Sequence, residues 1–467
     1  MKRIKLKSIL TIAFSLVMTT TAFAAGNDFS NKLPNVKADM LKPGFWINNA
    51  SNANKVVMNG AQTEQLNENF VKEISTVVDL EKYNQSFTKN ELKEKILNLS
   101  TPSKNPRYDK YGNLVTEEYY NKLNENLNLD SLQDVTSVKY GITVRRTLMK
   151  TFPTYDLLFK QGDNYEFDRL METAVYPIEP LVILGESKDK QWYFAQMYNY
   201  LAWIPAKDVA LATKEKLFDY VNNNRFLVAT GKRVFTVYNP LDKELSEIKF
   251  DMGVRIPLAD NSEFKDELYG QSTVTNYVVK VPVRDNDGNM VLKCALIPRS
   301  EDVNEGYLPY TKKSILNQAF KFLGERYGWG GMFEARDCSA FIMDIYRSMG
   351  IKLPRNTDEQ EDRAVGKIYE MKENIPLKER EKILKKLNEG GVLYMPGHTM
   401  LYLGQYQGEH YMIHDFSGYY NKESDGSYKY YKARQVMVTP VKLVGSDDGK
   451  TYLEDMTTVK EFVLTNK

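Results

Sequence analysis

The pattern of apolar and polar positions divides the chain into stretches of different periodicity. Residues 25 to about 135 are polar and rich in Asn, Lys and Glu, and apolar residues recur at helical spacing over 66–80 and 91–99. From about 138 to 300, short runs of β-branched and aromatic residues are separated by Gly, Pro, Asp and Asn. We therefore expect a mainly helical N-terminal region followed by small β-barrels.

Helical spacing returns beyond Tyr310 and predicts two helices in succession. The first stops at the glycine-rich sequence YGWGG, and the second has Asp337 as its N-cap and Gly350 at its end. Cys338 is therefore expected in the first turn of the second helix. The apolar faces of the two helices consist of Ile315, Leu316, Ala319, Phe320 and Leu323, and of Phe341, Ile342, Ile345 and Met349.

Two alternating strands follow in the sequence GHTMLYLGQYQGEHYMIHDF, and they are predicted to form a hairpin. Residues 406–408 include the glycine that suits a tight turn. A three-residue turn at this point makes Gln405 face Glu409 and Met400 face His414. The register of this hairpin decides which histidines meet.

The chain contains three histidines, and the predicted register brings two of them together. His398 and His414 lie on the same face as diagonal neighbours within reach of each other's side chains. His410 pairs near Gly404, which is roughly 20 Å from His398 at about 3.3 Å per residue. This geometry excludes His410 as the partner of His398.

Cys338 is the candidate nucleophile. A thiol attacks as its thiolate, and the pKa of a cysteine is lowered at the N-terminus of a helix and beside a protonated imidazole. Main-chain N–H groups of a first turn can also stabilise an oxyanion. These conditions favour a Cys/His/His triad in which Cys338 is the nucleophile, His398 the general base and His414 the group that orients His398.

Simpler interpretations compete with this one. A cysteine on a helix is more often a packing residue than a catalytic one, and we interpret Cys294, in the alternating sequence VLKCALI, as a core strand residue. The spacing of four between His410 and His414 suits a zinc site on a helix, but the strand-like residues between them place the two rings apart. We expect neither a metal nor another cofactor.

Residues 1–24 have the pattern of a secretory signal peptide. The segment begins with four positive charges, continues with an apolar run over 9–17 and ends with the small-residue sequence Ala22-Phe23-Ala24. The apolar run is shorter than the roughly 20 residues of a membrane-spanning helix. Cleavage near Ala24 makes the mature protein secreted, periplasmic or associated with the cell wall, without stable membrane insertion.

Charge and length narrow the class of protein further. Removing the four positive charges of this segment changes the formal net charge from +2 to −2. Lys and Glu are interspersed along the chain, which argues against a nucleic-acid partner. The length exceeds what one hydrophobic core usually organises, so several domains are expected.

Two stretches of the β-rich region resemble known modules. The sequence QWYFAQMYNYLAWIPAKDVALA, at 191–212, resembles the distal half of a bacterial SH3-like domain, and residues 225–299 resemble a second, more divergent copy. In cell-wall enzymes such modules flank a catalytic domain and bind or orient the polymer.

The sequence YGWGGMFEARDCSAFIMDIYRSMGIKLPRNTDEQ, at 327–360, resembles the catalytic segment of the NlpC-type cysteine peptidases of the cell wall. The resemblance implies a papain-like α+β domain in which Cys338, His398 and His414 match the catalytic residues. The whole layout resembles the subgroup that hydrolyses the bond between γ-D-glutamate and a diamino acid, which implies a thioester intermediate on Cys338.

The same resemblance implies substrate contacts. Tyr327 would help line the oxyanion site, Asp337 and Ser339 would contact substrate, and Tyr200 would close over the free amino end of the stem peptide. Asn356 stands where members that demand a free amino end often carry an acidic residue, and a neutral amide holds an ammonium group less firmly. Asn356 therefore predicts a weaker preference for a free amino end.

These observations predict an α+β multidomain protein. Its parts are a signal peptide (1–24), a mainly helical region (25–135), two SH3-like β-barrels (136–212 and 213–305) and an NlpC-type peptidase domain (306–467). We expect a monomer that acts on peptidoglycan stem peptides or muropeptides. The alternatives are a non-catalytic wall-binding protein and an amidase or acyl transferase on the same fold.

Overall fold

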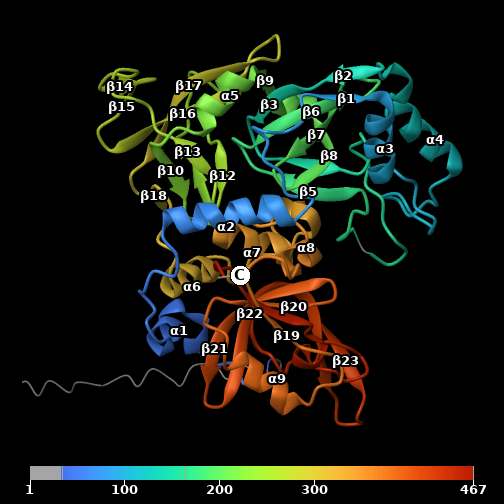
Figure 1. The fold of residues 1–467 in the computed structure, drawn as a ribbon, viewed down its shortest axis with the longest axis vertical. Coiled ribbons are helices and arrows are strands. Elements are labelled where there is room, and N and C mark those ends of the chain that lie inside the picture. The colour runs from blue at the N-terminus through green and yellow to red at the C-terminus, as the bar shows by residue number, and fades with distance from the viewer. Residues whose placement is uncertain (1–32, 34, 164, 466–467) are drawn as a thin grey trace, which may run out of the picture.

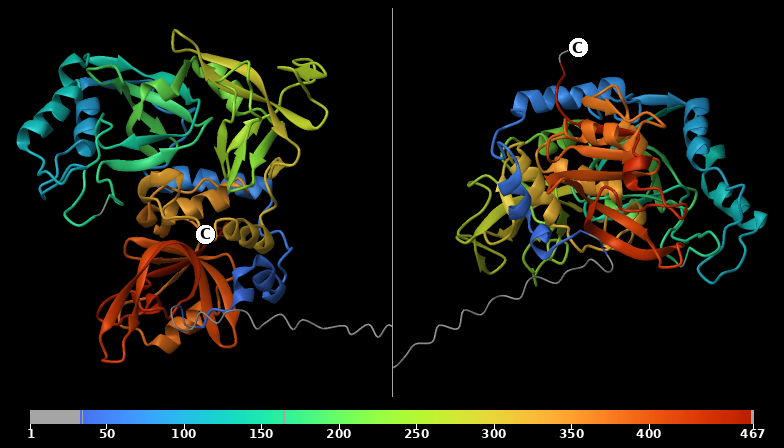
Figure 2. Two further views of the ribbon diagram at one scale, coloured as in Figure 1. Left: turned by 180° about the vertical axis from the view of Figure 1, so that it is seen from behind. Right: turned by 90° about the horizontal axis from the view of Figure 1, so that it is seen from below.

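The computed structural model describes residues 33, 35–163 and 165–465, so the predicted signal peptide lies outside the described residues. Two β-rich parts stand side by side at one end of the molecule, and a six-stranded sheet forms the other end (Figures 1 and 2). A layer of helices lies between them. Within the described ranges, no helix is both long and apolar enough to cross a membrane.

Helices are the main regular elements of the chain before residue 138. The elements are η1 (Ala38–Leu41), α1 (Pro43–Asn49), α2 (Gly60–Glu73), β1 (Ser86–Thr88), α3 (Lys89–Leu99), α4 (Glu117–Asn126), η2 (Leu129–Ser131) and β2 (Val135–Ser137). The helix α2 stops well short of residue 80, because the residues from Ile74 to Val78 include several β-branched side chains that form helices poorly. Instead, Val78 donates its main-chain N–H to the carbonyl of Tyr198 and docks on the next part of the chain.

A seven-stranded antiparallel sheet follows, with the strand order β5-β4-β8-β7-β6-β3-β9. Its elements are β3 (Lys139–Thr143), β4 (Thr147–Lys150), β5 (Met171–Val175), β6 (Pro180–Glu186), β7 (Trp192–Met197), β8 (Tyr200–Pro205), η3 (Ala206–Asp208) and β9 (Val209–Ala212). Trp192, Phe194 and Trp203 are buried in it. The stretch 191–212 thus forms strands, as its sequence pattern predicts.

The second β-rich part consists of small antiparallel sheets. Its elements are α5 (Lys214–Val221), β10 (Phe226–Ala229), β11 (Arg233–Phe235), β12 (Lys249–Asp251), β13 (Arg255–Pro257), β14 (Glu267–Leu268), β15 (Gln271–Ser272), β16 (Asn276–Arg284), β17 (Met290–Pro298) and β18 (Val303–Glu305). Cys294 lies in β17, where it is only partly buried beside Val278 and Leu296.

The C-terminal part packs helices against a six-stranded antiparallel sheet of order β19-β24-β20-β21-β22-β23. Its elements are α6 (Lys312–Phe320), η4 (Trp329–Glu334), α7 (Cys338–Arg347), α8 (Thr357–Glu361), β19 (Lys367–Glu370), α9 (Leu377–Leu384), β20 (Val392–Met395), β21 (His398–Tyr406), β22 (Glu409–Lys422), β23 (Tyr428–Pro440), α10 (Tyr452–Asp455) and β24 (Thr458–Glu461). The nine residues from Cys338 to Tyr346 of α7 are all buried. This helix therefore runs through the centre of the molecule (Figure 1).

The hairpin of β21 and β22 has a tighter turn than the sequence pattern suggests. Tyr406 pairs directly with Glu409, so the loop has two residues and Gln405 faces His410 rather than Glu409. A bulge between Tyr402 and Gly404 then shifts the register by one residue. Beyond the bulge, at the end of the hairpin that carries His398, the strands follow the predicted register again.

Candidate active site

Cys338 is the first residue of α7, and Asp337 is the N-cap that the sequence predicts. The Asp337 side chain accepts a hydrogen bond from the main-chain N–H of Ala340 at 3.0 Å. The Cys338 Sγ lies 3.9 Å from Thr357 Oγ1 and accepts a hydrogen bond from the main-chain N–H of Thr399. Because Thr399 follows His398 in the chain, the thiol lies against the start of β21.

His398 and His414 meet across the hairpin. His398 Nε2 lies 2.9 Å from His414 Nδ1, and His414 Nε2 lies 3.0 Å from Thr439 Oγ1. A neutral imidazole carries one donor and one acceptor nitrogen. If both rings carry their proton on Nε2, His398 donates to His414, His414 donates to Thr439, and His398 Nδ1 is left to accept a proton.

Aromatic side chains enclose the histidine pair. The Phe416 ring stacks on His414 with centroids 3.9 Å apart, and the Tyr452 ring meets His414 edge-on at 5.3 Å. Burial lowers the pKa of His398 to about 4 and that of His414 well below its usual value. Both imidazoles are therefore neutral at pH 7, which is the state in which His398 can accept a proton.

The electrostatic state of the thiol differs from the sequence expectation. Burial raises the pKa of Cys338 to about 12, and the negative charge of Asp337 acts in the same direction. The helix N-terminus alone was expected to lower this pKa, and that expectation is wrong because the N-cap is a carboxylate and the site is enclosed. The resting pair is thus a thiol and a neutral imidazole, not a thiolate and an imidazolium.

A pH dependence follows for any reaction that uses His398 as a base. Protonation of His398 blocks its acceptor nitrogen, so kcat/KM should fall on the acid side with a midpoint near pH 4, the value to which burial lowers its pKa. A pH series of initial rates checks this, with circular dichroism at each pH to confirm that the protein stays folded. An acid midpoint near 6.5 would show that His398 is not buried in the working enzyme.

The third histidine lies in a different environment. His410 Nδ1 lies 2.7 Å from the Tyr402 hydroxyl, on the turn side of the bulge. The predicted separation of His410 from the other two histidines is therefore confirmed. Within the described ranges, no group of three or more His, Cys, Asp and Glu side chains is placed to hold a metal ion.

This difference between the histidines supplies a matched pair of variants. His414→Gln should lower kcat about a hundredfold, because His398 loses the aromatic-stacked acceptor that fixes its ring and tautomer. His410→Gln should change kcat less than about twofold. Initial rates on a synthetic stem peptide measure both, and equal losses in the two variants would remove His414 from the site.

Asp337 and Ser339 are engaged with a buried arginine that the sequence pattern did not single out. Arg355 donates to both carboxylate oxygens of Asp337, at 3.1 and 2.7 Å, and to Ser339 Oγ at 2.8 Å. Its Nε donates to Thr173 Oγ1 of β5 at 2.7 Å. Arg355 therefore ties the start of α7 to the seven-stranded sheet. The only sequence signal for it is its place directly after Pro354, in LPRN.

The remaining predicted contact residues surround the same region. The Tyr200 hydroxyl donates to Glu172 in a short hydrogen bond, and burial raises the pKa of Tyr200. Tyr327 pairs as a β-bridge with Arg336, two residues before Cys338. Asn356 is the N-cap of α8, the helix that contributes Thr357 to the thiol.

The glycine-rich sequence before Cys338 packs directly on the seven-stranded sheet. Gly330 and Gly331 have φ values of 59° and 95°, and a Cβ on Gly331 would lie 2.3 Å from the Cβ of Ala174 in β5. Arg146 donates to the carbonyls of Gly331 and Ala335 at 3.1 Å each. Close approach to β5 thus explains Gly330 and Gly331 of YGWGG.

Arg336 is a second residue whose role the sequence did not reveal. Its guanidinium is fully buried and binds Asp251 at 3.0 Å, Glu325 at 3.1 Å and Asp344 at 2.5 Å. The Tyr176 hydroxyl also donates to Asp344 at 2.7 Å. Asp251 belongs to β12 of the second β-rich part and Asp344 to α7, while Tyr176 joins the network from the first β-rich part through Asp344. The network around Arg336 therefore fixes the helix that carries Cys338 relative to its neighbours.

Comparison with known families defines the class of two parts of the chain. Residues 324–439 match the NlpC/P60 family, and residues 153–205 match the SH3 domain of SH3b1 type. The chain therefore contains an NlpC/P60 domain and an SH3b domain. The expected NlpC-type domain and one SH3-like domain are thus confirmed.

Individual relatives extend this result. Over 168 residues, 36% of this chain, the sequence is 26% identical to a γ-D-glutamyl-L-lysine dipeptidyl-peptidase from Bacillus cereus, and the match spans 45% of that relative's length. An NlpC/P60 endopeptidase from Photobacterium damselae subsp. piscicida has a similar structure, with a TM-score of 0.70 and 19% identity over 88% of this chain and 95% of that one. The second likeness shows a shared fold.

Proposed function

We propose that the chain is a secreted cysteine endopeptidase that hydrolyses peptidoglycan stem peptides at the bond between γ-D-glutamate and a diamino acid. The observation that carries this proposal is the position of the Cys338 thiol against the start of β21, where His398 binds His414. The name of the Bacillus cereus relative supports the choice of bond.

The proposed reaction proceeds through a thioester. The Cys338 thiol gives its proton to His398 Nδ1 as sulfur attacks the γ-carbonyl carbon of D-glutamate. The C–N bond then breaks, and the amino group of the diamino acid leaves with the proton from His398. Water attacks the thioester, His398 accepts the proton of that water, and the thiol is restored. The raised pKa of Cys338 requires this transfer to accompany attack.

The other residues have supporting roles in this proposal. Tyr327 lines the oxyanion site, while Asp337, Ser339, Tyr200 and Asn356 lie along the bound stem peptide. The Arg355 contacts of Asp337 and Ser339 support a positioning role for these two residues at the start of α7.

The domain organisation belongs to the same proposal. Residues 1–24 are a signal peptide, 25–135 a mainly helical region, 136–212 and 213–305 two SH3-like domains, and 306–467 the peptidase domain. The helices α1 to α4 support the assignment of 25–135, and the small antiparallel sheets of β10 to β18 support that of 213–305.

Digestion of defined stem peptides tests the proposed bond. The substrates are tripeptides and tetrapeptides with lysine or diaminopimelate at the third position, each with a free or an acetylated amino end. They are incubated with the protein, and the products are identified by mass spectrometry. The proposal expects alanyl-γ-glutamate and a free diamino acid or its peptide. Cleavage at a different bond, or no cleavage of any of these peptides, would contradict it.

A non-catalytic wall-binding protein is the second candidate, and the enclosed, high-pKa thiol of Cys338 is the observation that favours it. An inert domain has no need of a reactive thiolate. In that case binding to purified cell wall persists while all of the stem peptides stay intact.

A further inference from the structure

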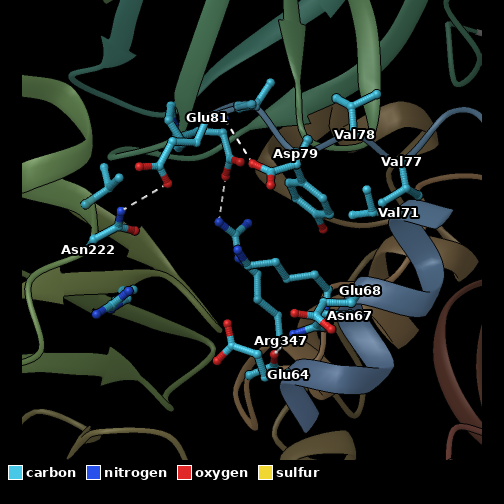
Figure 3. Close-up of a pocket in the computed structure, with 18 of the residues that line it drawn as sticks. Glu64, Asn67, Glu68, Val71, Val77, Val78, Asp79, Glu81, Asn222 and Arg347 are labelled. Carbon is cyan, nitrogen blue, oxygen red and sulfur yellow. Dashed lines mark hydrogen bonds and ion pairs between the residues drawn. The ribbon is translucent and has the colours of Figure 1, made fainter. Parts of the chain in front are cut away.

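The charged groups around the two ends of α7 are balanced differently. At the C-terminal end, Arg347 binds Glu179 at 2.6 Å and borders a cavity whose lining holds as many acidic as basic side chains (Figure 3). Near the N-terminal end, the side chain of Asp415 in β22 is fully buried. Within the part of the chain that the structure describes, neither of its carboxyl oxygens has a hydrogen-bond partner. A buried carboxyl group without partners is thus part of the surroundings of the thiol.

Asp415 lies close enough to the Cys338 thiol for its charge to act there. The register of β21 and β22, continued by two residues beyond its last pair, places Thr399 opposite Asp415. Thr399 in turn donates its main-chain N–H to Cys338 Sγ. Burial and the charge of Asp337 raise the pKa of Cys338 most, and a negative charge on Asp415 raises it further. The carboxyl group and the thiol therefore interact electrostatically.

The two neighbouring carboxylates have arginine partners of their own. Arg355 donates to Asp337 at 3.1 and 2.7 Å, and Arg336 binds Glu325 at 3.1 Å. Burial raises the pKa of Asp415 well above its usual value, and the charges of Glu325 and Asp337 raise it further. The opposite effect of Arg336 is smaller. Because an unpaired buried carboxylate is costly, Asp415 is protonated and neutral at pH 7.

The charge state of Asp415 matters when negative charge develops at the site. Attack by Cys338 requires sulfur to act as a thiolate, and it transfers negative charge to the carbonyl oxygen of the substrate. Burial raises the pKa of Tyr327, and the charge of Asp415 adds to this effect, so that charge also reaches the residue expected at the oxyanion site. Water screens charges in such an enclosed site only weakly. A neutral Asp415 leaves the developing charge unopposed, whereas an ionised Asp415 repels it.

We propose that Asp415 is a positioning residue that must be protonated for Cys338 to act as a nucleophile, and that its ionisation suppresses the thiol at alkaline pH. This inference rests on the proposed role of Cys338. The charged and titratable groups that act together with Asp415 are Glu325, Arg336, Asp337, Tyr327 and Cys338. The first three are held in ion pairs, so Asp415 supplies the change in charge that the thiol experiences.

Labelling of Cys338 at two pH values tests the proposal without a stem peptide. Iodoacetamide reacts with the full chain at pH 6 and pH 9, in the wild type and in Asp415→Asn, and peptide mapping follows Cys338. Asn has the shape of the neutral acid but does not ionise. The ratio of the rate at pH 9 to the rate at pH 6 should be at least about fivefold larger in Asp415→Asn, because only the wild-type thiol meets a new negative charge at the higher pH. A merely structural role would change both rates equally.

A matched control and a second variant complete the test. Asp425 is exposed in the turn between β22 and β23, and Asp425→Asn should give the same ratio as the wild type. Asp415→Ala also lacks the charge and should change the ratio in the same direction, which keeps the test open if Asp415→Asn does not fold. Circular dichroism at both pH values checks folding. Since labelling needs no hydrolysis, a protein that cleaves no stem peptide still gives a result. A wild-type ratio in the folded Asp415 variants would overturn the proposal.

Discussion

The Cys338→Ala variant should lose hydrolysis of stem peptides by at least about ten-thousandfold in kcat, because removing a catalytic nucleophile leaves only binding and oxyanion stabilisation. Release of the diamino acid, followed by chromatography, measures this loss. Folding should be retained, since Ala fits where the small Cys338 side chain begins α7.

The second cysteine provides the control for this experiment. Cys294 lies in β17, in a different part of the molecule, and its pKa is raised by burial. Cys294→Ala should keep full activity. Retention of more than about one per cent of the wild-type rate by Cys338→Ala would contradict a thioester on Cys338.

Replacing Arg336 by Met should lower the free energy of unfolding by about 3–5 kcal/mol, because the buried carboxylates of Asp251, Glu325 and Asp344 lose their shared cation. Urea denaturation followed by circular dichroism measures this change. The same substitution should also lower activity, since Arg336 links the start of α7 to β12 of the second β-rich part.

Arg326 is a surface arginine close to Arg336 in the sequence, and its replacement tests whether the loss of stability depends on burial rather than on charge. Arg326 pairs with Glu166 at 3.3 Å but its side chain is 56% exposed. Arg326→Met should therefore change the free energy of unfolding by less than about 1 kcal/mol. Equal stabilities of the two variants would show that the buried network does not hold the parts together.

Local patterns predicted most of the candidate site. The N-cap at Asp337 and the alternation of the hairpin placed Cys338 at a helix start and His398 beside His414, as the structure has them. The hairpin also shows how a prediction can succeed through two compensating differences. The turn at Gln407 and Gly408 is one residue shorter than expected, and the bulge near Gly404 restores the register.

Features that depend on contacts distant in sequence were not predictable. Arg336 and Arg355 look like ordinary surface residues in the sequence, and only the packing of the β-rich parts against α7 buries them. The pKa of Cys338 also depends on this enclosure. A helix N-terminus alone suggests a lowered value, whereas burial and the Asp337 carboxylate raise it.

The central claim is that His398 activates the Cys338 thiol, and the alkylation rates of the two cysteines test it most directly. Cys338 is only 7% exposed, whereas Cys294 is partly exposed, so accessibility alone makes Cys294 the faster. With iodoacetamide at pH 7 and peptide mapping, labelling of Cys338 should slow at least about tenfold in His398→Ala, because the base that accepts its proton is lost, while labelling of Cys294 should stay unchanged. An equal rate of Cys338 labelling with and without His398 would contradict the claim.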